Sequence, residues 1–141
     1  MMKPFQSIAV GYDGSHDAKV AARWAMEAAK DFGAVVTVVH ATGLREHLHQ
    51  QFVPDVTPPE LIALARECAF EESGLHWLIA NGDACSVLLR MASPPINADM
   101  LVVGSRGEGK REGLLLGSTS LEVAEHASVP VVVVPSSYVE N

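Results

Sequence analysis

Apolar residues along the chain follow two patterns, short continuous runs and longer stripes with helical spacing. The runs are nearly continuous in apolar character, which is typical of strands covered by helices on both faces. They are Ser7–Val10, Ala34–His40, Leu75–Ala80, Met100–Val103 and Val131–Val134. The stripes lie between them, so the order of elements is βαβαβαβαβ. This alternation predicts a parallel sheet with right-handed crossovers and helices on both faces.

Start signals place four expected helices. The first begins near Ser15, a good N-cap, with Asp17 favourably placed for the helix dipole. The second opens on Thr57-Pro58-Pro59-Glu60, which predicts a capping box between its first and last residues. Asp83 caps a short third helix, and the fourth starts around Ser118-Thr119.

The stretch from Thr42 to Asp55 breaks this rhythm, because it is polar and has no clear period. We interpret it as a mobile loop with at most one helical turn. His47 and His49 lie in it, but no third ligand is near in sequence, and two histidines spaced in this way on a helix face different directions. No metal site is predicted there.

Length and charge narrow the possible functions. The 141 residues are about the modal size of one domain, so residues 1–141 are expected to form a single domain. The net charge of −7 disfavours binding to nucleic acid or to an anionic membrane, since polyanion affinity comes mainly from clustered Lys and Arg.

The expected cellular compartment and the redox state of the cysteines are inferred from motifs that the sequence lacks. No apolar run approaches the roughly 18 residues of a membrane span, and the first six residues do not read as a signal peptide. Cys68 and Cys85 form no CxxC pair and are expected to be buried free thiols. We therefore expect a soluble, cytoplasmic protein with no membrane partner.

Candidate chemistry gathers after the fourth expected strand. In an open parallel sheet, ligands bind beyond the carboxyl ends of the strands, where the strand order reverses. Here Gly104–Gly113 holds four glycines, whose backbone a ligand can approach closely. Three basic and two acidic side chains give this loop a charge of +1, and Gly117–Ser120 then starts a helix whose amides favour an anion. Phosphate binding is predicted.

Two short phosphate motifs fit this loop poorly. A P-loop would need Ser or Thr where Arg111 stands, and would lead straight into its helix. The dinucleotide fingerprint fails because its third glycine, Gly113, arrives one position late. Both overlaps are interpreted as chance.

The longer spacing Gly104-x2-Gly107-x9-Gly117-Ser118 resembles that of the nucleotide-binding branch of the universal stress protein family. Three further segments are similar to the family's first strand and turn, its fourth-strand approach and its last strand. They are Ile8–Ser15, Asn97–Gly104 and Ala127–Pro135. The loop from Thr42 to Asp55 and the second helix match weakly.

The resemblance implies a single flavodoxin-like, adenine-nucleotide α-hydrolase-like α/β domain with three layers. Its five-stranded parallel sheet would have the order 3-2-1-4-5. Strands one and four would then lie side by side at the reversal point, so that Asp13 and Gly104 flank one crevice. The site chosen from the residues and the site implied by the family are the same.

The resemblance also implies roles for ten residues at matching positions. Beside the adenosine it places Asp13, Val103 and the backbone of Ala41. Along the ribose and phosphate path it places Gly104, Arg106 and Gly107, with Arg106 at a variable position of the family. Around the phosphates it places Gly117, Ser118, Ser120 and the backbone N–H of Thr119. Asp13 could instead only cap the first helix or form an Asx-turn.

The implied function is that of a nucleotide-sensing or regulatory module of the stress response, with ATP or AMP as ligand, with or without Mg²⁺. The last strand, Val131–Val134, would lie at the sheet edge, where a flat apolar strand needs cover. Pairing of these strands in a homodimer, which the family resemblance suggests, would supply it.

Catalysis is only weakly indicated. No serine has a base at a recognisable spacing, and no dedicated magnesium ligand is visible, so at most slow ATP hydrolysis is expected. The alternative is an adenine-nucleotide α-hydrolase enzyme that hydrolyses ATP or adenylates a substrate. Such enzymes carry Ser-Gly-Gly-x-Asp-Ser after the first strand, whereas Gly11–Asp17 reads differently. An interaction protein without nucleotide is a third hypothesis.

Overall fold

The structure, a computed structural model, describes residues 5–43, 53–105 and 117–138. Its helices and strands follow the expected alternation, with two short additions, β3 and the 3-10 helix η1. In chain order they are β1 (Ser7–Gly11), α1 (His16–Phe32), β2 (Val35–Ala41), β3 (Val53–Pro54), α2 (Pro59–Glu67), η1 (Glu72–Gly74), β4 (Leu75–Ala80), α3 (Ala84–Arg90), β5 (Met100–Gly104), α4 (Ser118–His126) and β6 (Val131–Val134).

The sheet has the order β3-β4-β2-β1-β5-β6. Its five parallel strands, β4-β2-β1-β5-β6, confirm the predicted order 3-2-1-4-5. The short β3 was not expected, since it belongs to the stretch interpreted as a loop. It pairs antiparallel with β4, with Val53 opposite Ile79 and Pro54 opposite Leu78. Two residues are too few to show an alternating pattern, and proline is tolerated in an edge strand.

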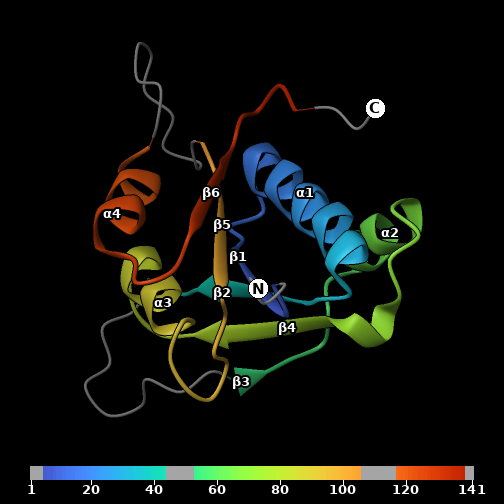
Figure 1. The fold of residues 1–141 in the computed structure, drawn as a ribbon, viewed down its shortest axis with the longest axis horizontal. Coiled ribbons are helices and arrows are strands. Elements are labelled where there is room, and N and C mark those ends of the chain that lie inside the picture. The colour runs from blue at the N-terminus through green and yellow to red at the C-terminus, as the bar shows by residue number, and fades with distance from the viewer. Residues whose placement is uncertain (1–4, 44–52, 106–116, 139–141) are drawn as a thin grey trace, which may run out of the picture.

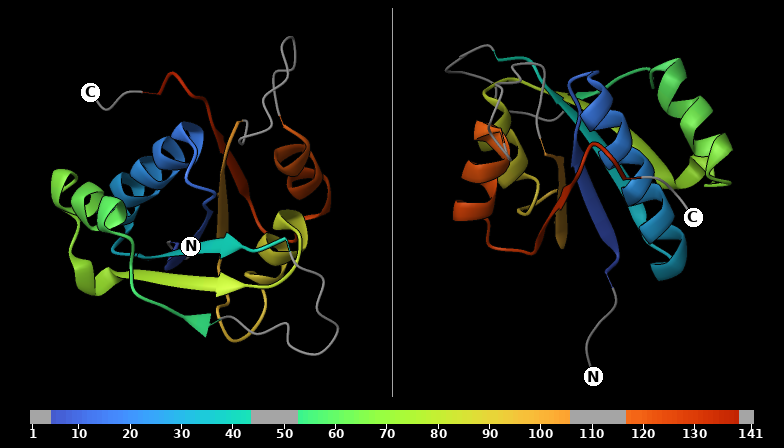
Figure 2. Two further views of the ribbon diagram at one scale, coloured as in Figure 1. Left: turned by 180° about the vertical axis from the view of Figure 1, so that it is seen from behind. Right: turned by 90° about the horizontal axis from the view of Figure 1, so that it is seen from above.

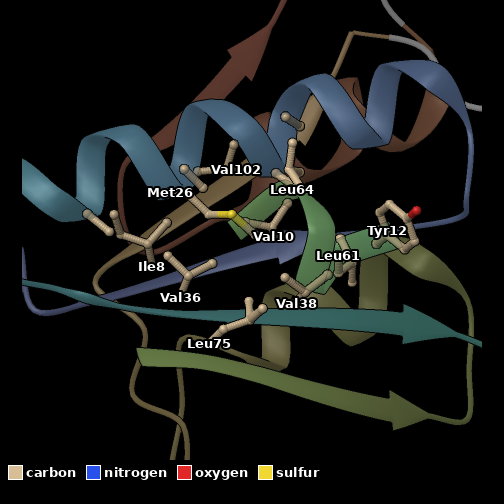
Figure 3. Packing of buried hydrophobic residues seen from close by; sticks show 14 of the residues in the cluster. Ile8, Val10, Tyr12, Met26, Val36, Val38, Leu61, Leu64, Leu75 and Val102 are labelled. Carbon is tan, nitrogen blue, oxygen red and sulfur yellow. The ribbon is translucent and has the colours of Figure 1, made fainter. Parts of the chain in front are cut away.

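Helices cover both faces of the sheet, as the nearly continuous apolar strands predict. Helices α1 and α2 lie on one face, and α3 and α4 on the other (Figures 1 and 2). Ile8 and Val10 of β1 pack toward α1, whereas Ala9 between them belongs to the cluster on the α3 and α4 side. Figure 3 shows the first cluster, which includes Met26 and Leu61. No described helix combines the length and the hydropathy that crossing a membrane requires.

Three of the four expected helix starts are confirmed, including that of α4 at Ser118, and one is wrong in detail. The Ser15 side chain accepts a hydrogen bond from the Ala18 amide, and the Asp83 side chain caps α3. Helix α2 has no capping box from Thr57, because its N-cap is Pro58, with extended backbone angles. The cause is Pro59, since a residue that precedes proline is excluded from the helical region.

Both cysteines are buried free thiols, as expected. Burial raises the pKa of the Cys85 thiol, and the Glu122 carboxylate on α4 raises it further. The thiolate that would react is therefore disfavoured at neutral pH.

Candidate functional site

A pocket of about 350 Å³ opens at the carboxyl ends of the parallel strands. It is lined by the ends of β1, β2 and β5 and by the first turns of α1, α3 and α4. Strands β1 and β5 are neighbours here, although the chain passes through β2 and β4 between them. The pocket therefore lies at the topological switch point, where ligands of doubly wound sheets bind.

Eight of the ten predicted site residues line this pocket. They are Asp13, Ala41, Val103, Gly104, Gly117, Ser118, Thr119 and Ser120. Arg106 and Gly107 lie outside the described residues. The structure thus brings together residues from four separate segments, as expected for the carboxyl edge of a parallel sheet.

Sequence reasoning missed eight other lining residues. They are Gly11, Tyr12, Ser15, Ala18, Val39, Ala84, Val87 and Leu88. A signal existed for Val39, because it lies two residues before Ala41 on the same strand and so shares its face. No such signal marked Val87 and Leu88, whose apolar helical positions look like ordinary core.

Three helix N-termini border the pocket, and they differ in how their amides are satisfied. The first turn of α1 is capped by Ser15 and that of α3 by Asp83. Helix α4 starts after Gly117, and among the described residues no side chain caps it. Its first turn also holds no acidic residue. Because the first amides of a helix lack intrahelical acceptors, those of Ser118, Thr119 and Ser120 can receive an anion.

Internal hydrogen bonds fix the start of α4 in place. The Gly117 amide donates to the Ser105 carbonyl at 2.7 Å, and the Ser120 hydroxyl donates to the same oxygen at 3.1 Å. The Ser105 amide in turn donates to the carbonyl of Val134 on β6. Ser120 is 3% exposed, so its hydroxyl holds the protein backbone. The group of Ser120 that is left to bind a phosphate is therefore its backbone amide.

Asp17 supports the same corner from α1. It lies in the first turn, as predicted for a dipole partner, but it is also fully buried. The Ser105 hydroxyl donates to its carboxylate at 3.4 Å. Gly104 packs against this turn so closely that a Cβ atom would lie 2.7 Å from the Asp17 carbonyl oxygen. The glycine is therefore required by packing, a reason that its place in the motif did not reveal.

The other half of the pocket is apolar. Side chains of Val39, Val87, Leu88 and Val103 belong to the cluster under α3 and α4, and all four line the pocket. Aliphatic walls of this kind suit a flat, largely apolar ring.

Asp13 is an exposed lining residue of the pocket, two residues after the end of β1. Its carboxylate accepts a hydrogen bond from the Ser15 amide at 2.9 Å, which is the Asx-turn that the sequence left open. The structural role and a position at the pocket thus coexist in this side chain.

Comparison with known proteins identifies the family. The sequence model of the universal stress protein family matches residues 4–135. The chain belongs to this family. A universal stress protein of Thermus aquaticus is 33% identical, and the match covers 92% of this chain and 98% of that one. Stress response protein NhaX of Bacillus subtilis is 27% identical, with 90% and 96% covered.

A solved universal stress protein in complex with cAMP also resembles this structure. The two are 26% identical and superpose with a TM-score of 0.65, over 95% of this chain and 99% of that one. The flavodoxin-like α/β fold expected for a universal stress protein is therefore confirmed.

Tyr12, at the pocket, carries a polar contact to the opposite face of the sheet. Its hydroxyl donates to the Glu60 carboxylate on α2 at 3.3 Å, and the residue is 6% exposed. Burial raises its pKa from 10.0 to about 12, and the negative charge of Glu60 adds to the effect.

This shift predicts a loss of stability at alkaline pH. The unfolded chain releases the Tyr12 proton near pH 10 and the folded chain near pH 12, so the stabilisation is complete below pH 10 and is lost between pH 10 and 12. The loss is on the order of 3 kcal/mol. We expect Tyr12→Phe to remove this part of the pH dependence in urea unfolding. Tyr138→Phe, which keeps Tyr12, is the matched control, and an unchanged alkaline slope in Tyr12→Phe would contradict the prediction.

Proposed function

We propose that this universal stress protein binds an adenine nucleotide, ATP or AMP, in the pocket at the switch point. The observation that carries the proposal is the start of α4, which no described side chain caps and whose amides can therefore bind an anion. The same pocket also contains aliphatic walls and the backbone of Ala41. The cAMP complex of a relative supports it, because cAMP combines the same base with a phosphate.

In this proposal the phosphates lie beside Gly117, at the amides of Ser118, Thr119 and Ser120. The base lies between Val39, Leu88 and Val103. Ala41 offers its backbone to the base edge, and Asp13 lies beside the adenosine. Gly104 lines the path from ribose to phosphate. Arg106 and Gly107, which lie outside the described residues, are proposed for the same path. Asp13 is the one carboxylate among the described lining residues, so Mg²⁺ is a variable of the test.

We propose that the bound nucleotide makes this single-domain cytoplasmic protein a sensing or regulatory module of the stress response. We also propose a homodimer through β6. That strand pairs with β5 alone among the described strands, and three of its four valines are half-buried. Pairing with a second copy would cover the open edge. A monomeric mass in light scattering at micromolar concentration would contradict the dimer.

The direct test is to purify the protein, release bound nucleotide by heat and identify it by chromatography. Thermal unfolding with ATP, AMP, cAMP and GTP, each with and without Mg²⁺, then measures selectivity. At 100 times its dissociation constant, a ligand of the native state adds about 2.7 kcal/mol to stability. We expect the adenine nucleotides to raise the melting temperature and GTP to leave it unchanged. Release of ADP at a steady rate would instead favour an enzyme.

A further inference from the structure

His40 is the next-to-last residue of β2, directly before Ala41. Its imidazole lies on the α1 and α2 side of the sheet. The ring stacks on Trp77, with ring centroids 6.3 Å apart and an angle of 16° between the planes. Its Nδ1 atom lies 3.1 Å from the carbonyl oxygen of Tyr12. Because a carbonyl oxygen can only accept, Nδ1 carries the proton and donates it.

This hydrogen bond stands where the ladder between β1 and β2 ends. The last ladder bond runs from the Tyr12 amide to the Val39 carbonyl, at 2.9 Å. In a parallel pair the next bond would run from the Ala41 amide to the Tyr12 carbonyl. No such backbone bond occurs between these two described residues. The Tyr12 carbonyl meets the His40 imidazole instead.

The direction of the Ala41 amide follows from its neighbour. The Thr42 amide donates to the Ala80 carbonyl on β4, at 3.0 Å. Successive residues of a strand direct their backbone groups to opposite sides, so the N–H and C=O groups of Ala41 point toward the β1 side. Ala41 lines the pocket on that side. It therefore presents one donor and one acceptor to whatever binds there.

We infer that His40 is a positioning residue that holds the Tyr12 carbonyl away from Ala41 and so leaves the Ala41 amide open to the base of the ligand. The inference rests on the proposed function, which it deepens by naming the device that supports base selection. Tyr12 is held on the same face by two further contacts, its hydroxyl bond to Glu60 and an edge contact with Trp77 whose ring centroids are 5.9 Å apart.

The chemistry selects adenine by its edge. Adenine N1 accepts a hydrogen bond and the adjacent amino group donates one, which matches the Ala41 pair. In hypoxanthine N1 donates and the adjacent oxygen accepts, so the same pair is mismatched at both atoms. Without the imidazole, the Tyr12 carbonyl is free to accept the ladder bond from Ala41, and the donor is lost to the ligand.

The test compares AMP with IMP by titration calorimetry on the full chain and on three variants. His40→Leu keeps an apolar side chain over Trp77 but removes the donor. His40→Asn restores a donor close to the position of Nδ1. His76→Leu is the matched control, since His76 is exposed on the neighbouring strand β4. NMR of the ligand-free proteins follows the temperature dependence of the Ala41 amide proton shift, which falls when that amide is bonded.

We expect His40→Leu to weaken AMP binding about tenfold, the effect of losing one hydrogen bond, and to bring the dissociation constants of AMP and IMP together. The asparagine variant and His76→Leu should keep both affinity and discrimination. Equal fold losses for AMP and IMP in His40→Leu would leave discrimination unchanged, which would overturn the inference and reduce His40 to a packing role. An unchanged affinity for AMP would overturn it as well. If the wild type binds neither nucleotide, the proposed function fails. In that case the NMR measurement on the Ala41 amide of His40→Leu still tests whether His40 keeps this amide open. An unchanged temperature dependence of its proton shift would overturn that part of the inference too.

Discussion

Replacing Gly117 with aspartate is expected to abolish nucleotide binding while slightly stabilising the ligand-free protein. Gly117 is the N-cap of α4 with φ −76° and ψ 166°, an extended conformation that any residue adopts. Aspartate is a preferred N-cap, and its carboxylate would occupy the open amides, for a gain of a few tenths of a kcal/mol. The same carboxylate repels phosphate, because two like unit charges 4 Å apart near a protein surface repel each other by about 4 kcal/mol. We expect ATP affinity to fall at least about 100-fold.

Two neutral variants at the same position separate charge from size. Gly117→Ala adds a methyl group without capping the helix and should bind within a few-fold of wild type. Gly117→Asn caps the amides without charge and should be intermediate. Calorimetric titration with ATP, together with urea unfolding of each ligand-free variant, measures both effects. Wild-type affinity in a folded Gly117→Asp protein would place the phosphates elsewhere.

The core of the fold could be predicted from the sequence because the central strands β1, β2 and β5 are buried on both faces. Ser7–Val10 and Leu75–Ala80 are apolar at nearly every position, which indicates strands in the interior of a sheet covered by helices. The start of α2 could not be placed as well. Thr57 and Glu60 have capping-box spacing, yet the clash imposed by Pro59 on Pro58 outweighs one side-chain hydrogen bond.

The site could be predicted where it depends on strand ends, and not where it depends on packing in space. Ala41 and Gly104 end strands and Asp13 comes two residues after one, and parallel strands bring their carboxyl ends to one edge. Leu88 lines the pocket from a helix, and in sequence such a residue looks like any other core position. The hydrogen bond from His40 to Tyr12 is a contact across two strands that no local pattern encodes.

Gly104→Ala is expected to destabilise the fold by about 3 kcal/mol, the upper range for forcing a methyl group into a packed site. The added Cβ would lie 2.7 Å from the carbonyl oxygen of Asp17 and 2.9 Å from its carbonyl carbon. Both are backbone atoms in the first turn of α1, so relief requires the helix to move away from β5. The midpoint of urea unfolding should fall with no change in slope.

Gly11→Ala is the matched control, since Gly11 ends the neighbouring strand β1 and also lines the pocket. Its Cβ would lie 2.8 Å from Leu88 Cδ1, the flexible end of a side chain that can rotate away. We expect a loss of about 1 kcal/mol there. Equal losses in the two variants, or a Gly104→Ala protein as stable as wild type, would mean that α1 yields easily. Gly104 would then be needed only for the approach of a ligand to the backbone.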